Sequence, residues 1–426
     1  MRYWDDPYFL NMNIYSFSEG SLKRTGGIGI YSVPKIAKSL ADRGHSVVVS
    51  TGGQIILDAE SSNHINIENL DRDENGPGKC SFIVYPSFGK WQFSSSMYWK
   101  SRQNVKDADF IMLHSLYTFP VLVGYLLARR YNVPFGLWLH GVLAPFQRTI
   151  GATKKAIYNR LFARSILDNA SVIIFTAEGE REETLPLDLK APSVVIPLGF
   201  DMTPFYNLPK HGHFRNKYLD NHKGPLILYL GRLNIKKGID KLIEAFSQCL
   251  VQYPNARLAI VGGGDPKKFE DQVLDWLIEN DVQNQSVMTG PLFHFEKLSA
   301  FADADLFVLP SQAENFGHAI FEAMASRLPV VISDQINLAG EIHRNNAGLV
   351  VPCDVSAIVK AIISLLTDSQ LRQRFGNNGL LLAKSYNWEN TAEKIETAIE
   401  CILQKKPFPS ILGPINAIEE NKRVLG

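Results

Sequence analysis

Two glutamates, Glu314 and Glu322, lie on either side of an Asn-Phe-Gly sequence that follows the apolar stretch DLFVLP. A strand ending at Pro310 and a helix beginning near Gly317 would place Glu314 in the loop and Glu322 more than one turn inside the helix. The first N–H groups of a helix lack intrahelical acceptors and carry partial positive charge, which favours phosphate oxygens. Carboxylates accept hydrogen bonds from hydroxyls. This spacing therefore predicts a site for a molecule that has both phosphate and sugar groups.

A basic sequence, GRLNIKKG, follows the strand-like stretch LILYL. Arg232 ends that strand, and Lys236 and Lys237 precede the next helix. A guanidinium offers a planar fork of donors and an ammonium offers a compact charge, so the two together suit a diphosphate. A solvated basic loop explains any one of these residues, but three of them at one strand's carboxyl end favour phosphate binding.

Three glycine-containing segments are further candidates. TGGIGIYSV brings Gly27 and its neighbours ahead of a helix, where backbone N–H groups can approach an anion. The segment lacks the G-x-G-x-x-G spacing of dinucleotide-binding proteins. AIVGGGDP and VMTGPL also end strands, although a tight turn explains each equally well. The candidate contacts in these two segments are Gly263, Pro291 and Leu292.

The elements that must position these residues alternate between short apolar strands and amphipathic helices in both halves of the chain. This alternation indicates α/β architecture with parallel sheets covered by helices. We expect two Rossmann-like, doubly wound domains that face each other across a cleft, because ligands of such sheets bind at the carboxyl ends of the strands. The predicted domains are residues 1–203 and 204–399, with the tail of about 400–426 returning to the first.

The charge, the cysteine spacing and the lengths of the apolar stretches argue against several classes of protein. The 426 residues carry 44 basic and 43 acidic side chains, a net charge of +1 that argues against a nucleic acid partner. Four scattered cysteines form no C-x-x-C, so no zinc site or disulfide framework is predicted and a reducing cytoplasm is expected. The N-terminus shows no signal sequence, and no apolar stretch approaches the roughly 18 residues needed to span a bilayer.

Three D-x-D sequences resemble metal-binding motifs: Asp71/Asp73, Asp107/Asp109 and Asp303/Asp305. The last two directly precede predicted strands and therefore lie at the amino ends, away from the expected site. The first lies in a polar loop. We interpret all three as structural and predict no metal.

The combination of GRLNIKKG with SQAENFGHAIFEAMA resembles the donor-site signature of glycosyltransferase family 4, whose members are retaining enzymes of the GT-B fold. GGIGIYSVPKIAKSLADRGHSV and LHG are similar to the N-terminal motifs of that family. VIPLGFD resembles the segment that ends its first domain, although Leu198 stands where the family usually has asparagine. YNWENTAEKI resembles the start of its C-terminal helix.

The resemblance implies roles for individual residues. Arg232 and Lys237 would bind the donor diphosphate, together with the backbone N–H of Gly27. Glu314 would hold hydroxyls of the transferred sugar, Glu322 the ribose, and His140 would contact the sugar from the other domain. Backbone N–H groups at the helix start would assist. The residues of that helix start are Asn315, Phe316, Gly317, His318 and Ala319.

The same resemblance implies the reaction. A hexose, with glucose first among the candidates, would move from a UDP-sugar to a glycan or lipid-linked acceptor with retention, in polysaccharide biosynthesis. No cofactor or metal would be needed. In this mechanism the leaving diphosphate helps to deprotonate the acceptor, and fixed N–H dipoles with two cations stabilise the charge that builds on it. We expect a cytoplasmic protein.

Alternatives stay open at this stage. A nucleotide-sugar epimerase of the same fold would need an acid and a base at the sugar ring, and a dinucleotide oxidoreductase would need the glycine pattern that is missing here. The helix ATKKAIYNRLFARSIL is basic and amphipathic, which suits either a peripheral contact with the inner face of a membrane or a solvated outer helix. His114 and the aromatic segment 85–103 suit either acceptor contacts or ordinary packing.

Overall fold

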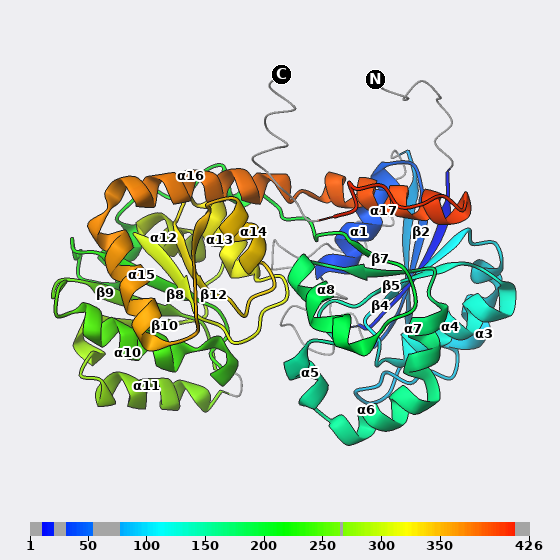
Figure 1. Ribbon diagram of the computed structural model, residues 1–426, viewed down its shortest axis with the longest axis horizontal. Helices are drawn as coiled ribbons and strands as arrows, with labels where there is room; N and C mark the ends of the chain where they lie inside the picture. Colours follow the sequence, from blue (N-terminus) through cyan, green and yellow to red (C-terminus); the bar gives the residue numbers. More distant parts are fainter. Residues whose placement is uncertain (1–10, 21–30, 54–76, 265–266, 414–426) are drawn as a thin grey trace. The chain divides into compact units, whose positions relative to one another are not determined.

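The computed structural model describes residues 11–20, 31–53, 77–264 and 267–413, and these form two compact units (Figure 1). The first unit holds the chain up to Thr176, Glu180–Leu198 and Trp388–Gly413. The second holds Ala177–Gly179 and Gly199–Asn387. Each unit contains one parallel sheet with its own helices, as the alternating sequence pattern predicts.

The first sheet has the order β3-β2-β1-β4-β5-β6-β7, and all of its neighbours pair in parallel. Its inner strands are apolar and buried, as strands covered on both faces must be. The order reverses between β1 and β4. The strands are β1 (Asn13–Ser18), β2 (Ser46–Gly52), β3 (Lys79–Tyr85), β4 (Phe110–His114), β5 (Phe135–Trp138), β6 (Val172–Phe175) and β7 (Ser193–Val195).

The helices of the first unit cover both faces of this sheet. Helices α1 and α17 contact each other on one side, while α3 and α4 contact each other on the opposite side (Figure 1). The described helices are α1 (Val33–Asp42), α3 (Met97–Lys106), α4 (Phe119–Tyr131), α5 (Pro145–Thr149), α6 (Ala152–Tyr158), the π-helix η2 (Asn159–Ala163), α7 (Arg164–Asn169), α8 (Glu178–Thr184), the 3₁₀ turn η3 (Leu185–Leu187) and α17 (Trp388–Leu403).

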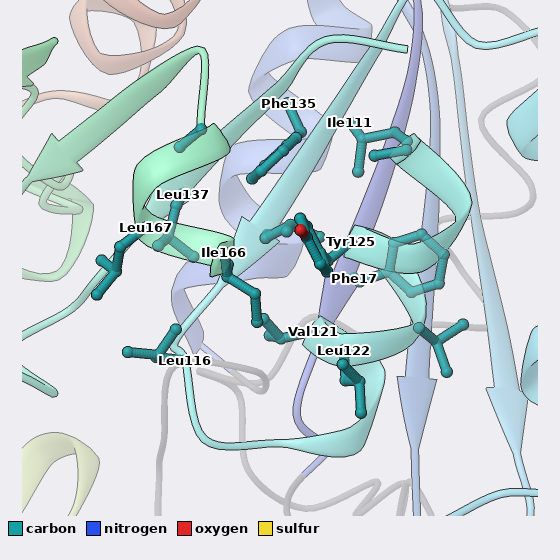
Figure 2. Packing of buried hydrophobic residues seen from close by; sticks show 14 of the residues in the cluster. Phe17, Ile111, Leu116, Val121, Leu122, Tyr125, Phe135, Leu137, Ile166 and Leu167 are labelled. Atoms are coloured by element: carbon teal, nitrogen blue, oxygen red, sulfur yellow. The ribbon is translucent and has the colours of Figure 1, made fainter. Parts of the chain in front are cut away.

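The core between α4, α7 and the sheet is built from large apolar side chains (Figure 2). Phe17 and Leu113 come so close to Gly124 that a Cβ added at that glycine would lie 2.7 Å from a Phe17 ring carbon. Interiors are packed as densely as organic crystals, so this close approach sets α4 firmly against β1 and β4.

The second sheet has the order β10-β9-β8-β11-β12-β13, again with parallel pairing throughout. Its order reverses between β8 and β11. Strands β8 to β11 occupy the stretches that the sequence analysis identifies as strands. The six strands are β8 (Leu226–Leu230), β9 (Arg257–Val261), β10 (Ser286–Gly290), β11 (Leu306–Leu309), β12 (Val330–Ser333) and β13 (Gly348–Val351).

Helices α10, α11 and α15 lie on one face of the second sheet, and α12, α13 and α16 lie on the other (Figure 1). Helices α15 and α16 begin at aspartate N-caps, Asp354 and Asp368, whose carboxylates accept backbone N–H bonds. The helices and turns are η4 (Thr203–Phe205), α9 (His213–Tyr218), η5 (Ile235–Lys237), α10 (Ile239–Cys249), α11 (Phe269–Glu279), η6 (Gln283–Gln285), α12 (His294–Asp303), α13 (His318–Ala325), α14 (Ala339–Arg344), α15 (Val355–Thr367) and α16 (Ser369–Ser385).

The division of the chain differs from the predicted boundaries. The chain leaves the first unit after Leu198 rather than after residue 203. It returns to the first unit at Trp388 rather than near residue 400. Helix α17 belongs to the first unit because it packs on α1 and because Glu396 bonds there with two side chains. His45 Nε2 lies 3.1 Å from Glu396 Oε1, and Arg43 Nε lies 2.7 Å from Glu396 Oε2.

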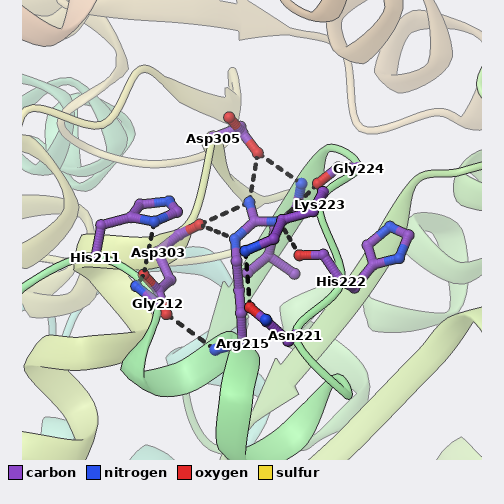
Figure 3. A network of polar contacts seen from close by, with 10 residues as sticks. His211, Gly212, Arg215, Asn221, His222, Lys223, Gly224, Asp303 and Asp305 are labelled. Atoms are coloured by element: carbon purple, nitrogen blue, oxygen red, sulfur yellow. Dashed lines mark hydrogen bonds and ion pairs between the residues drawn. The ribbon is translucent and has the colours of Figure 1, made fainter.

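Aspartates of two of the three D-x-D sequences lie at the amino ends of strands and accept hydrogen bonds from other residues of the chain. Asp303 accepts the backbone N–H of Arg215, and Asp305 accepts that residue's guanidinium and the N–H of Leu226 (Figure 3). Asp109 accepts the N–H of Asn13 at 2.7 Å. These bonds support the structural interpretation, whereas Asp71/Asp73 lies outside the described residues.

Within the described ranges, none of the helices combines the length and apolarity that a bilayer crossing requires.

Candidate functional site

The predicted site residues of the second unit follow four neighbouring strands, β10, β9, β8 and β11, at their carboxyl ends. Arg232 and Lys237 follow β8, and Glu314 follows β11, so they flank the point where the strand order reverses. Open α/β sheets bind ligands at this switch point. The sequence pattern located the strand ends correctly, and the topology brings these residues to one place.

Lys237 and Glu314 form an ion pair between the loops after β8 and β11. Lys237 lies in η5 and is buried, whereas Glu314 is partly exposed. The loops are also joined through the carbonyl of Lys236, which accepts the N–H of Gln312 at 2.7 Å and the hydroxyl of Ser311 at 3.0 Å. An ammonium has three donors, so Lys237 can hold Glu314 and still donate to a phosphate oxygen.

Gly317 is the N-cap of helix α13 and adopts the left-handed conformation with φ 67°. That conformation suits glycine because a Cβ at this position would lie 2.8 Å from Ile320 and 3.2 Å from Glu314. Phe316 is buried and stacks on Phe321 with ring centroids 4.5 Å apart. The side chain of Phe316 therefore anchors the loop, and the predicted contribution of this residue to binding is through its backbone.

Glu322 lies in the second turn of α13, as expected, and its carboxylate pairs with Lys297 of α12 at 2.6 Å. Both side chains are largely buried. No local sequence pattern predicts this contact, because Lys297 and Glu322 lie on different helices. His318 is exposed and Ala319 is half-buried at the helix start.

The glycines of the neighbouring loops allow close backbone contacts. A Cβ at Gly262 would lie 1.8 Å from the carbonyl oxygen of Gly231, and one at Gly238 would lie 2.1 Å from that of Pro310. The carbonyl of Gly263 accepts the N–H of Leu233 at 2.9 Å. Pro291 is 3.7 Å from the Cβ position of Gly263, and Leu292 follows it in the loop after β10. These segments therefore pack closely against the neighbouring loops, and they line the same sheet edge.

Two residues that sequence reasoning missed stabilise this edge. Tyr229 is buried in β8, and its hydroxyl donates to the carbonyl of Arg232 at 3.0 Å. Burial and the nearby Glu314 raise the Tyr229 pKa, so the hydroxyl keeps its proton. Asn337 donates its N–H to the Glu314 carbonyl at 3.1 Å and its side-chain amide to Asn315 at 3.2 Å. A tyrosine in an apolar strand and an asparagine in a loop carry no distinctive spacing.

In the first unit, His140 follows β5 and is buried against Trp138, with parallel rings 5.1 Å apart. Its Nε2 lies 3.0 Å from Nδ1 of His114 at the end of β4. Burial lowers the His114 pKa to about 3, and burial and the neighbouring His114 lower the His140 pKa as well, so both rings are neutral. His114 is therefore packed inside the protein. Gly27 lies outside the described residues.

Among the described residues, no three His, Cys, Asp or Glu side chains are grouped so that they could hold a metal ion.

Comparison with protein families agrees with this geometry in both units. A model described as Glycosyltransferase Family 4 matches residues 25–203. A second model, described as Glycosyl transferases group 1, matches residues 212–381 and so covers all the site residues of the second unit. The chain belongs to glycosyltransferase family 4. It is an enzyme that transfers a glycosyl group, and its two Rossmann-like units have the GT-B fold.

Glycosyltransferases with assigned activities resemble the chain over most of its length. The D-inositol 3-phosphate glycosyltransferase of Kineococcus radiotolerans is 24% identical over 398 residues, which cover 86% of this chain and 88% of the relative. The phosphatidyl-myo-inositol mannosyltransferase of Mycolicibacterium smegmatis is 25% identical over 389 residues, covering 88% and 90%.

Solved glycosyltransferase structures share the fold. Sucrose-phosphate synthase from Thermosynechococcus elongatus has a TM-score of 0.67 at 23% identity, covering 92% of this chain and 99% of the other. Anabaena HepE, solved in complex with UDP and glucose, also has a TM-score of 0.67 at 20% identity, covering 91% and 99%.

Proposed function

We propose that the protein is a retaining, metal-independent glycosyltransferase that moves a hexose from a UDP-sugar to a glycan or lipid-linked acceptor. Glucose is the first candidate for the hexose, and polysaccharide biosynthesis is the expected process. The observation that carries the proposal is the Lys237–Glu314 ion pair at the switch point of the second sheet, beside the start of α13. One site thus offers a cation, a carboxylate and helix N–H groups together.

In this proposal the diphosphate binds between the loop after β8 and the start of α13. Arg232 is exposed and supplies a planar pair of donors, whereas Lys237 is buried and supplies a fixed charge. The first N–H groups of α13 have no intrahelical acceptor and add partial positive charge. These groups would stabilise the negative charge that develops on the leaving UDP. The leaving diphosphate would then accept the proton of the attacking hydroxyl.

The two glutamates would hold the two sugars on either side of the diphosphate. Glu314 would accept hydrogen bonds from the hexose, and the ion pair with the Lys237 ammonium orients its carboxylate. Glu322, oriented by Lys297, would accept hydrogen bonds from the ribose diol. Anabaena HepE, whose fold this chain shares, was solved with UDP and glucose, which supports UDP-glucose as the first donor to test.

The first unit would contact the acceptor, and we propose that it also contacts an anionic membrane surface. Helix α6 and η2 present Ile157 and Leu161, four positions apart and both exposed, beside Lys154 and Arg160. The hairpin turn that follows β3 adds exposed aromatic side chains and Lys90. Its Trp91 ring lies 6.5 Å from that of Tyr158, which joins the hairpin to α6.

The charge of this region fits an anionic surface. Residues 75–167 contain twelve lysines and arginines but only two acidic residues, Asp107 and Asp109, although the whole chain has a net charge of +1. Exposed apolar side chains interleaved with basic ones suit a bilayer interface, where the apolar groups enter the headgroup region and the cations contact anionic lipids. The apolar members of this surface are Phe88, Trp91, Phe93, Phe146, Ile150, Ile157 and Leu161.

The donor and the reaction can be tested together. Calorimetry with UDP-, GDP- and ADP-sugars should give the tightest binding for a UDP-hexose, and anomeric analysis of the transferred product should show retention. Incubation with the UDP-sugar alone separates transfer from epimerisation, because an epimerase would release an epimeric nucleotide sugar without any acceptor. Tightest binding of a GDP-sugar, or an epimerised product, would contradict the proposal.

Membrane contact can be tested without any substrate. The protein should sediment with vesicles of phosphatidylcholine and phosphatidylglycerol but not with phosphatidylcholine alone, and salt should weaken the binding. Ile157→Glu should lower vesicle affinity about tenfold or more. Ile278→Glu in the second unit is the matched control, because both isoleucines are 59% exposed. If both variants lose vesicle affinity equally, or if Ile157→Glu binds vesicles as tightly as the wild type, this surface does not contact the membrane.

A further inference from the structure

Buried Glu180 connects the two loops that surround His140. Its carboxylate accepts the backbone N–H of Gly141 through one oxygen and that of Thr176, 2.6 Å away, through the other. Gly141 follows β5 and Thr176 follows β6, so one side chain bonds to the ends of two neighbouring strands. Glu180 is only 1% exposed, and it does not belong to any motif that pointed to chemistry in the sequence.

The backbone beside this carboxylate has an unusual conformation. His140 has φ 52° and Gly141 has φ 78°, so two successive residues are left-handed. A non-glycine residue in this region costs free energy and persists only where its surroundings hold it. The hydrogen bond from Gly141 to Glu180 fixes the turn directly after the histidine.

The histidine ring is held as tightly as its backbone. It stacks on Trp138 and bonds to His114, which leaves Nδ1 of His140 as a buried polar atom without a hydrogen-bond partner in the described protein. Buried polar atoms are almost always paired, and exceptions often indicate a functional role. The ring is thus held with one hydrogen-bonding atom available for a ligand.

We propose that Glu180 is a positioning residue for His140, holding the left-handed turn that sets the imidazole for contact with the transferred sugar. The inference rests on the proposed transfer reaction. Glu180 itself would not touch the substrate. Removing it should release the turn at Gly141 and let the imidazole leave the orientation that Trp138 and His114 define.

A double-mutant cycle tests this role, because residues that act through one another have non-additive effects. Glu180→Ala should lower kcat about tenfold or more with little change in UDP affinity, and the same substitution should have almost no further effect in a His140→Ala background. Glu180→Gln, which keeps one carbonyl acceptor, should restore part of kcat. Glu341→Gln, at a buried glutamate of the second unit, controls for destabilisation alone and should leave kcat unchanged.

Hydrogen exchange provides a readout that does not need activity. The Gly141 and Thr176 amides, which lose their acceptor, should exchange faster in Glu180→Ala than in the wild type, while the other first-unit amides keep their protection. Losses of kcat that multiply in the double variant, or unchanged exchange at Gly141, would overturn the inference. A wild-type protein without transferase activity would instead refute the proposed function, and the exchange result would still report on the turn.

Discussion

The ammonium of Lys237 pairs with the carboxylate of Glu314 across the point where the second sheet reverses its strand order. The two residues are 77 positions apart in the chain, and only the parallel pairing of β8 with β11 brings their loops together. The pair joins the groups proposed for the diphosphate and for the hexose. A substitution at either residue should therefore alter the position of the other. Arg232 does not belong to this pair, so a substitution there separates diphosphate binding from hexose binding more clearly.

Arg232→Ala should raise the dissociation constant for both UDP and the UDP-sugar, because a guanidinium bonded to a diphosphate serves both ligands equally. A charge-assisted bond of this kind contributes roughly 1.5–3 kcal/mol, so affinity should fall about tenfold or more. Glu314→Ala should impair transfer and UDP-sugar binding much more than it changes UDP binding. Titration calorimetry with both ligands measures the difference, and unchanged UDP affinity in the arginine variant would refute the diphosphate assignment.

Glu322 should give the site its preference for ribose over deoxyribose. The wild-type protein is expected to bind UDP more tightly than 2′-deoxy-UDP, because the carboxylate loses one hydroxyl partner in the deoxy ligand. Glu322→Ala should bind the two ligands about equally. Lys297→Met removes the carboxylate's partner but keeps the carboxylate, so it should weaken the preference without abolishing it. A preference that survives in Glu322→Ala would place the ribose elsewhere.

Close backbone contact at the site predicts that Gly238 does not tolerate a side chain. Gly238 and Gly151 both have φ 65°, but a Cβ would lie 2.1 Å from the Pro310 carbonyl oxygen at Gly238 and meets nothing within 4 Å at Gly151. Gly151→Ala should cost about 1 kcal/mol through backbone strain alone. Gly238→Ala should cost at least about 3 kcal/mol, because the loop after β11 must also move. Thermal unfolding and UDP binding measure both effects, and equal losses would argue against the close contact.

Much of this site follows from the sequence because its residues directly follow apolar strands. Arg232 and Glu314 are next to stretches whose strand character is clear, and the rule that parallel strands share a carboxyl edge brings them together. Partners on other elements could not be found in the same way. Lys297, Asn337 and Glu180 reach site residues or their direct neighbours only in the folded chain, and no local pattern distinguishes them from other polar residues.

The predicted domain boundaries differ from the division of the structure for a similar reason. The amphipathic pattern of α17 shows that one of its faces is buried but does not say against which sheet. Its assignment to the first unit depends on contacts with α1 and on the bonds of Glu396 to Arg43 and His45, more than 350 positions away in the chain.

A chelator should leave transferase activity unchanged. In the proposed mechanism, Arg232, Lys237 and the start of α13 stabilise the charge on the leaving diphosphate, so a divalent cation has no required role there. Asp303 and Asp305, which resemble a metal-binding motif, instead accept hydrogen bonds from Arg215 and neighbouring backbone groups. Initial rates with and without EDTA, after exhaustive dialysis, test this expectation. Strict dependence on Mn²⁺ would contradict it.

Glu180 should make the first unit less stable as the pH rises. Burial raises the pKa of Glu180 to about 7 from an ordinary value of 4.5, although the N–H groups of Thr176 and Gly141 favour the ionised form. The folded protein therefore binds this proton more tightly than the unfolded chain does. The stabilisation from this bound proton is fully present below the pKa that Glu180 has in the unfolded chain. It is lost as the pH rises through the pKa that Glu180 has in the folded protein.

The magnitude follows from the shift, because each pKa unit corresponds to about 1.4 kcal/mol. Between about pH 4.5 and pH 8 the free energy of unfolding should fall by roughly 3 kcal/mol from this residue alone. Glu180→Gln has no proton to lose, so its stability should change less over the same range and the two curves should converge at low pH. Urea unfolding of both proteins across this range gives the comparison. Parallel curves would show that the carboxyl is ionised throughout, held by its two backbone donors despite its burial.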